Sequence, residues 1–199
     1  MEIIPVIHIK KRKITAEKGG KVLSLQEILD HVDTDKPLYI LDEDGIEEDK
    51  PNLCSYPKLS EHCAIWVDAG PRVLGDVVDA VTAGANNIVI RKGLWPTFEG
   101  AQIKDITENE IYSVLDLQSY DGYVADVSPN DIDGLVVLES TGQIKSDFKT
   151  GGFLRSLCAK HKIYLYVSSL MNKLYWEEVG VSGLLINLNR AKGFKDHDI

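Results

Sequence analysis

The chain has 199 residues, of which 44% are hydrophobic, so we expect a single domain spanning residues 1–199 with a full-sized core. Its formal net charge of −9 argues against a nucleic-acid-binding protein, because neutralising phosphates requires a basic face. Because it has no long apolar run and its three cysteines form no Cys-x-x-Cys pair, we expect a soluble cytoplasmic protein without membrane contact.

Short runs rich in β-branched residues recur along the chain, and each run ends in a polar cluster. This pattern is typical of β-strands. Eight strands are predicted, at Ile3–Ile9, Leu38–Asp42, Ala64–Asp68, Ile88–Arg91, Ile111–Leu117, Leu135–Glu139, Ile163–Ser168 and Leu184–Asn187. Between them, Ser24–His31, Arg72–Ala83 and Lys149–Lys160 are predicted helices. Continuous apolar strands alternating with helices indicate a parallel sheet, and eight such units close into a (β/α)8 barrel, the TIM barrel.

The fifth strand has an alternative. Thr107–Glu110 has the form of a capping box, which would make the following residues a helix and Tyr123–Val127 the strand. That choice leaves only Ser128–Asp133 for a parallel crossover, which normally needs about a dozen residues. We therefore predict a strand at Ile111–Leu117.

The helices around the fourth to sixth strands are predicted to be reduced. Gly122–Asp133 contains Pro129 and few helix formers, and Thr97–Asn109 is equally poor in helical pattern. Elsewhere, the basic run Lys10–Lys13 is interpreted as a solvated loop.

The second half of the chain repeats the first in register. The pairs are Leu38–Gly45 with Leu135–Gly142, Ile65–Asp68 with Leu165–Ser168, Gly84–Ile90 with Gly180–Ile186, and Ile4–Ile9 with Tyr112–Leu117. Matches in the same order predict a barrel of two similar halves, with paired ligand sites related by a pseudo-twofold axis.

Ionisable side chains follow the predicted strands at their carboxyl ends, where the active sites of this fold lie. The repeat places His8 and Asp116 at equivalent positions on opposite sides of the mouth. An imidazole and a carboxylate there can act as general acid and general base near neutral pH. Equally good interpretations are a histidine that bonds a neighbouring loop and an aspartate that caps one.

Further residues at the same rim are candidates for binding. Substrate-binding candidates are Asp42, Asp44, Arg72, Glu139 and Thr141; the first two share one side of their strand and either bind hydroxyls or tie down loops. Phosphate-binding candidates are Arg91, Lys92, Ser168, Ser169 and Asn189. Charged donors lie mainly in the first half, so we expect tighter anion binding near Arg72 than near Ser168. The histidine spacing gives no metal site, and no cofactor is expected.

The ordered motifs resemble the HisA/HisF barrels of histidine biosynthesis. The residues that carry the resemblance are Ile3–Ile7, Leu38–Gly45 with its D-x-D-G element, Asp68–Arg72 leading to Ala83–Asn86, and Val114–Asp116. The resemblance implies an Amadori-type rearrangement of an aminoaldose, with aspartates as acid and base. Asp116 matches one family aspartate, whereas His8 and Thr141 stand where two others are usual. Ser168–Leu170 and Asn187–Asn189 replace the family's glycine-bearing phosphate turns.

Three functions stay open. The first is a HisA-like isomerase or lyase that acts on a small phosphorylated, sugar-like metabolite, with His8 and Asp116 as acid and base. The second is the phosphoribosylformimino-aminoimidazole-carboxamide ribotide isomerase itself. The third is a non-catalytic binding or regulatory barrel, whose reduced side would expose apolar surface to a second copy of the chain or to a protein partner.

Overall fold

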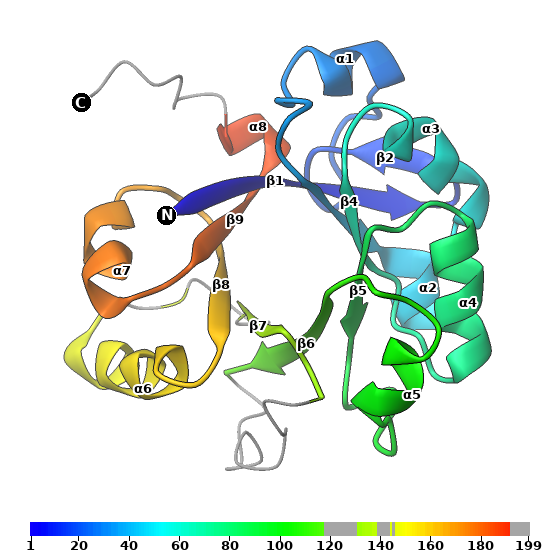
Figure 1. Cartoon of the computed structure of the whole chain (residues 1–199). Coiled ribbons are helices and arrows are strands. Elements are labelled where there is room, and N and C mark those ends of the chain that lie inside the picture. Colours follow the sequence, from blue (N-terminus) through cyan, green and yellow to red (C-terminus); the bar gives the residue numbers. More distant parts are fainter. Residues whose placement is uncertain (118–130, 139–143, 145, 192–199) are drawn as a thin grey trace.

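The fold is that of a computed structural model, which describes residues 1–117, 131–138, 144 and 146–191. Parallel strands form a closed barrel with the helices on its outside (Figure 1). Its eight strands are β1 (Glu2–Lys10), β3 (Leu38–Asp42), β4 (Ile65–Asp68), β5 (Asn87–Ile90), β6 (Ile111–Asp116), β7 (Gly134–Leu138), β8 (Lys162–Val167) and β9 (Gly183–Asn187). Pairing of β1 with β9 closes the ring, so the predicted TIM barrel is confirmed.

The helices follow the prediction in part. They are α1 (Leu25–Leu29), α2 (Glu43–Glu48), the 3-10 turn η1 (Leu53–Ser55), α3 (Tyr56–Ser60), α4 (Leu74–Thr82), α5 (Gly100–Lys104), α6 (Phe148–Cys158), α7 (Lys173–Val179) and α8 (Leu188–Ala191). The expected helices correspond to α1, α4 and α6. The helix after the fourth predicted strand, which is β5 in the structure, was expected to be reduced. This is confirmed, since α5 has 5 residues.

The fifth predicted strand, for which a helix was the alternative, is the strand β6. The segment offered as the alternative strand, and most of the segment in which the next helix was expected to be reduced, lie outside the described residues. Among the helices that the structure describes, none has the length and apolar character needed to cross a membrane.

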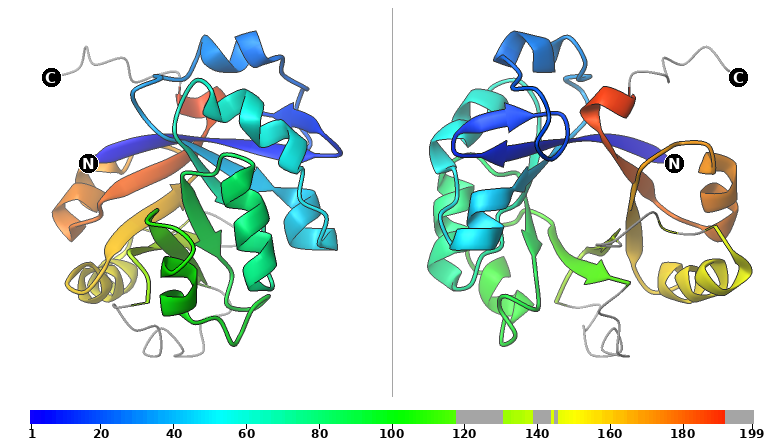
Figure 2. Two further views of the ribbon diagram at one scale, coloured as in Figure 1. Left: turned by 45° about the vertical axis from the view of Figure 1, so that its right-hand side comes forward. Right: turned by 180° about the vertical axis from the view of Figure 1, so that it is seen from behind.

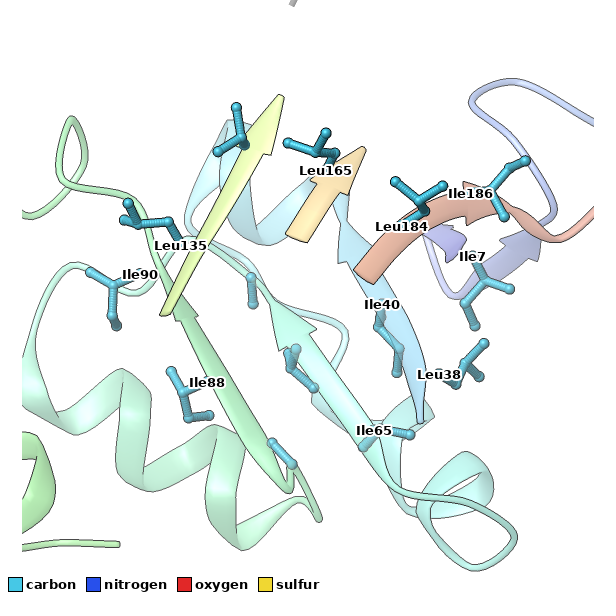
Figure 3. Packing of buried hydrophobic residues seen from close by; sticks show 14 of the residues in the cluster. Ile7, Leu38, Ile40, Ile65, Ile88, Ile90, Leu135, Leu165, Leu184 and Ile186 are labelled. Atoms are coloured by element: carbon cyan, nitrogen blue, oxygen red, sulfur yellow. The ribbon is translucent and has the colours of Figure 1, made fainter. Parts of the chain in front are cut away.

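Two apolar layers hold the barrel together. One lies between strands and helices and includes Ile7, Ile40, Ile65, Ile88 and Leu184 (Figure 3). The other fills the barrel itself, and its aromatic members are Tyr39, Trp66, Tyr112 and Tyr164. Trp66 and Tyr112 stack with ring centroids 4.3 Å apart, and both contact Tyr164 edge-on. Because these rings fill the interior, we look for a ligand site at the mouth.

The sequence repeat maps onto opposite sides of this barrel. The repeated segments form β1 and β6, β3 and β7, β4 and β8, and β5 and β9. In the ring order each strand lies four positions from its counterpart. The two halves of the sequence therefore form two half-barrels.

The basic run is exposed, as predicted, but it forms a tight β-hairpin. β2 (Lys13–Thr15) pairs antiparallel with the end of β1, and Lys10 pairs with Lys13 across the two strands. Lys11 and Arg12 are therefore the two central residues of a tight hairpin turn. The hairpin was not predicted, because neither residue is a usual turn former.

Candidate active site at the barrel mouth

A cavity of about 320 Å³ opens at the carboxyl ends of the strands, within the size range of small-ligand sites. Its polar lining residues are His8, Lys18, Tyr39, Glu43, Glu47, Arg91 and Tyr166, and its apolar lining residues are Leu41, Ile46, Val136, Leu138 and Leu185. The cavity is therefore lined by both apolar and charged side chains, as a site for a small, partly polar molecule requires.

His8 is one of the lining residues and has several polar neighbours. Strand alternation turns Ile4 and Val6 into the barrel interior, and the next inward position on β1 is His8. His8 is 5% exposed, and its Nδ1 lies 3.1 Å from Glu43 Oε1. Its Nε2 lies 3.4 Å from both the Tyr166 hydroxyl and Asn187 Oδ1. When Nδ1 donates to the carboxylate, Nε2 is left to accept or release a proton on the cavity side.

Glu43, the first residue of α2, is a buried carboxylate with cationic neighbours. Lys10 Nζ lies 3.3 Å from its Oε2, and Lys18 Nζ lies 4.0 Å away. Lys10 also donates to Glu47 over 2.7 Å, and hydrogen bonds to Glu47 and Glu43 raise the pKa of Lys10. The same bond from Lys10, with a second from Lys18, lowers the pKa of Glu47. Both lysines are thus already paired with carboxylates.

A second ion pair forms part of the same wall. Asp68, at the end of β4, is fully buried and accepts two hydrogen bonds from Arg91, from Nε at 2.8 Å and Nη2 at 2.7 Å. The Tyr39 hydroxyl donates to the same carboxylate at 2.9 Å. Burial disfavours the charge of Arg91, but attraction to Asp68 and the hydrogen bonds to it together outweigh burial, so the pKa of Arg91 is raised. Asp68 is therefore offset by Arg91 rather than left to repel an anion.

Asp116 ends β6 at the inward position that follows Tyr112 and Val114. Its side chain is half-buried, and its charge contributes to the raised pKa of Arg91. It therefore lies within electrostatic reach of the Arg91 side of the cavity.

Tyr166 supplies a neutral hydrogen-bond donor. Its hydroxyl donates to Asn187 Oδ1 over 2.6 Å. Burial raises the pKa of Tyr166, and the hydrogen bond with Asn187 acts against it. The phenol therefore stays protonated at neutral pH, next to His8 Nε2.

Asp42 and Asp44 do not line this cavity. Asp42 is fully buried and accepts hydrogen bonds from the Gly45 and Asn52 backbone N–H groups, at 3.1 and 2.6 Å, and from the Tyr56 hydroxyl at 2.6 Å. Asp44 accepts from the Lys11 backbone N–H and from Asn52 Nδ2. The geometry matches the loop-binding interpretation of both residues.

Arg72 also lies away from the cavity. Its guanidinium donates to the carbonyl oxygens of Gly45, Ile46 and Gly70, at 3.0, 3.0 and 2.9 Å, and to Asp49 at 2.9 Å. These bonds join the loop after β4 to α2, and they engage Nη1 and Nη2 of the guanidinium in holding the backbone.

The remaining predicted residues are spread around the rim. The Ser168 carbonyl accepts from Arg190, and the Ser169 hydroxyl accepts from the Met171 backbone N–H. Asn189 is exposed on α8, and Lys92 is half-buried beside Arg91. Glu139 and Thr141 lie outside the described residues. The structure thus brings His8 and Arg91 into one cavity, with Asp116 near Arg91.

Sequence reasoning missed Glu43 and Tyr166 as site residues. The two-residue periodicity of strand side chains could have placed both facing the barrel interior. Glu43 lies between two aspartates that face the loops, and Tyr166 lies two residues after the inward Tyr164. In the described part of the chain, no group of three or more His, Cys, Asp or Glu side chains is arranged to hold a metal ion.

No protein-family model matches the chain, and no curated protein matches it. Solved structures do match it. Three mutant structures of the tryptophan synthase α-subunit from the hyperthermophile Pyrococcus furiosus align with TM-scores of 0.60, at 14%, 13% and 14% identity. Each alignment covers 96% of this chain and 88% of the other. At this identity the likeness establishes the TIM-barrel fold and does not assign chemistry.

Proposed function

We propose that this barrel is an acid–base enzyme of the isomerase or lyase type, acting on a small sugar-like metabolite in the mouth cavity. The observation that carries the proposal is the buried pair of His8 and Glu43, 3.1 Å apart, at the edge of a cavity of about 320 Å³. A carboxylate that holds one imidazole nitrogen directs the other toward the ligand, which is the arrangement general acid–base catalysis requires.

The proposed roles follow from the contacts. His8 Nε2 exchanges a proton with the substrate, and Glu43 positions the ring and stabilises its charged form. Asp116 is the second proton-transfer group, near Arg91. Tyr166 donates a hydrogen bond to a substrate oxygen when it turns from Asn187. The apolar wall, which includes Leu41 and Val136, binds the carbon skeleton and excludes water.

A phosphate on the substrate would bind at Arg91 and Lys18, the two cations that reach this cavity from different sides. Each already has a carboxylate partner, Asp68 for Arg91 and Glu47 for Lys18. A phosphate therefore has to share or replace an existing ion pair. Because an ion pair has to be shared or replaced, the phosphate contributes less to binding than it would beside a free cation. We therefore expect a few hydrogen bonds and apolar contacts to hold the ligand, with the phosphate as an additional anchor.

The second candidate is HisA/HisF membership, with the ribotide isomerase activity of histidine biosynthesis. The inward position of Asp116 favours it, because that residue matches the family's fifth-strand aspartate. Rescue of a histidine auxotroph that lacks this isomerase would establish the activity. Failure to rescue, with normal expression of the folded protein, would leave the first proposal in place.

Solvent exchange tests the main proposal even while the substrate is unidentified. The protein is incubated in D₂O with a pool of sugar phosphates and related metabolites, and mass spectrometry follows deuterium incorporation at carbon. Wild type should label at least one compound. The variants His8→Asn and Asp116→Asn should each slow labelling by roughly 10²- to 10⁴-fold, the usual contribution of general acid–base catalysis.

His62→Gln is the matched control, since this histidine is exposed and far along the chain from the cavity residues. It should label at the wild-type rate. Labelling that survives His8→Asn would contradict the assignment of His8. If wild type labels nothing and no pool member binds, the non-catalytic barrel becomes the better account.

A further inference from the structure

The turn of the β1–β2 hairpin carries two residues in an unfavourable backbone conformation. Lys11 has φ = 50° and Arg12 has φ = 62°, so both central residues lie in the left-handed region, as a type I′ turn demands. Such turns strongly prefer Asn-Gly, because a Cβ atom crowds the backbone in this region, glycine has none, and asparagine can compensate by bonding locally. Here two long cationic side chains occupy both positions. Strain of this kind at a turn is a reason to look for a function of the side chains.

The surrounding structure holds this turn in place. The Lys11 backbone N–H donates to the Asp44 carboxylate, and the Arg12 backbone N–H donates to Asn52 Oδ1 over 2.8 Å. Asp44 and Asn52 are both buried, and Asn52 in turn donates to Asp42. Buried side chains thus hold the backbone of the turn, while the side chains of Lys11 and Arg12 are exposed.

Lys11 and Arg12 line a groove of about 600 Å³ between the hairpin and residues 50–54. The other charged lining residues are Asp44, Glu48 and Lys50. Glu48 pairs with Lys50 at 3.3 Å, and hydrogen bonds from Asn52 and the Lys11 backbone lower the pKa of Asp44 against the effect of burial. Within the described residues, no carboxylate pairs with the side chain of Lys11 or Arg12, in contrast to Lys10 and Lys18 at the barrel mouth.

Helix α2 separates this groove from the barrel cavity. Glu43 and Glu47 line the cavity, whereas Asp44 and Glu48, each the next residue along the helix, line the groove. Figure 2 shows the hairpin beside this helix. A helix with its side chains is about 10 Å across, so one small molecule does not fill both spaces.

We propose that this groove is a second ligand site, which binds the phosphate group of a small molecule through Lys11 and Arg12. The guanidinium of Arg12 provides parallel donors for two phosphate oxygens, and Lys11 adds a compact charge. The strained turn holds both cations over the groove. The site does not depend on catalysis in the barrel.

Nuclear magnetic resonance on the ¹⁵N-labelled full chain tests the site. Sodium phosphate and, separately, glycerol 3-phosphate are titrated at constant ionic strength, with sodium chloride as the reference. Amides of Lys11, Arg12 and Asn52 should shift saturably with phosphate and not with chloride. Tighter binding of glycerol 3-phosphate than of inorganic phosphate would identify an esterified ligand, and the reverse order would identify the free ion.

The double variant Lys11→Gln, Arg12→Gln should weaken binding by about tenfold or more, because both charge-assisted donors are lost. Lys13→Gln is the matched control: it removes the same kind of charge next to the turn, outside the groove, and should weaken binding less than about twofold. Equal losses in the two variants, or equal shifts with chloride, would show a diffuse charge effect and overturn the proposal.

A second variant separates binding from folding. Lys11→Asn with Arg12→Gly installs the preferred turn residues, so it should raise the thermal midpoint and abolish the phosphate-dependent shifts. If this variant still binds phosphate at the hairpin, the two cations are not the site. If it lowers the midpoint, the strain argument is wrong.

Discussion

Glu43 and Asp44 are consecutive residues whose carboxylates belong to two separate networks. Glu43 Oε1 lies 3.1 Å from His8 Nδ1 in the barrel cavity, whereas Asp44 accepts the Lys11 backbone N–H at the hairpin. Both residues lie in the first turn of α2, which Asp42 caps by accepting the Gly45 N–H. The orientation of His8 and the shape of the hairpin therefore depend on the same helical turn.

The first prediction concerns Gly45, where α2 approaches the loop after β4. A Cβ added there would lie 2.5 Å from the Ala69 carbonyl oxygen, so backbone has to move. Gly45→Ala should lower the free energy of unfolding by about 1–3 kcal/mol, as overpacking does. Gly75→Ala in α4 is the control: its nearest contact is at 4.0 Å, and it should stabilise the protein by up to about 1 kcal/mol. Urea denaturation of both variants measures this, and equal stabilities would contradict the close approach.

The second prediction concerns Glu43 as a positioning residue. Glu43→Gln keeps the side-chain shape but removes the charge that holds His8, so labelling in D₂O should slow, by less than in His8→Asn. Combining both changes should be no worse than His8→Asn alone, because the two residues act as a unit. Fully additive losses would show that Glu43 acts on catalysis independently of His8.

The third prediction concerns the buried pair of Asp68 and Arg91. Arg91→Met leaves the Asp68 carboxylate buried without its cation, which should destabilise the fold by about 3–5 kcal/mol. Adding Asp68→Asn should recover part of that loss, because the uncompensated charge is then gone. Chemical denaturation of the single and double variants gives both numbers. A double variant less stable than Arg91→Met would contradict this interpretation of the pair.

The fourth prediction concerns the pH dependence of stability at α1. Glu27 accepts hydrogen bonds from the Ser24 backbone N–H and hydroxyl and from Lys21, and these lower its pKa from 4.5 to about 2. A depressed carboxyl pKa contributes stability above the unfolded value, and that contribution disappears as the pH falls toward 2. The stability difference between wild type and Glu27→Gln should therefore be constant above pH 4.5 and shrink below it. Denaturation at several pH values measures it; a difference that grows on acidification would reverse the assignment.

The strands and their order could be predicted because a buried parallel strand is a continuous apolar run, and such runs are visible in sequence. α2 could not, because it begins directly at the end of β3. There the periodicity changes from two residues to 3.6, so Asp44 lies on α2 and not on the strand to which alternation assigns it. Asp42 and Asp44 still share Asn52 as a partner, and Glu43, between them, lines the barrel cavity. The position of Arg72 was also hidden, since its partner carbonyls lie on α2, 26 and 27 residues away in the chain.

The proposed function depends on the mouth cavity being the place at which His8 meets a substrate. A crystal structure of the protein soaked with the metabolite that acquires deuterium, or with the whole pool, tests this. We expect ligand density in the cavity, with an oxygen or carbon-bound proton of the substrate within reach of His8 Nε2 and its skeleton against Leu41 and Val136. Ligand density only outside the cavity, with His8 still bonded to Glu43 and no molecule beside it, would contradict the proposal.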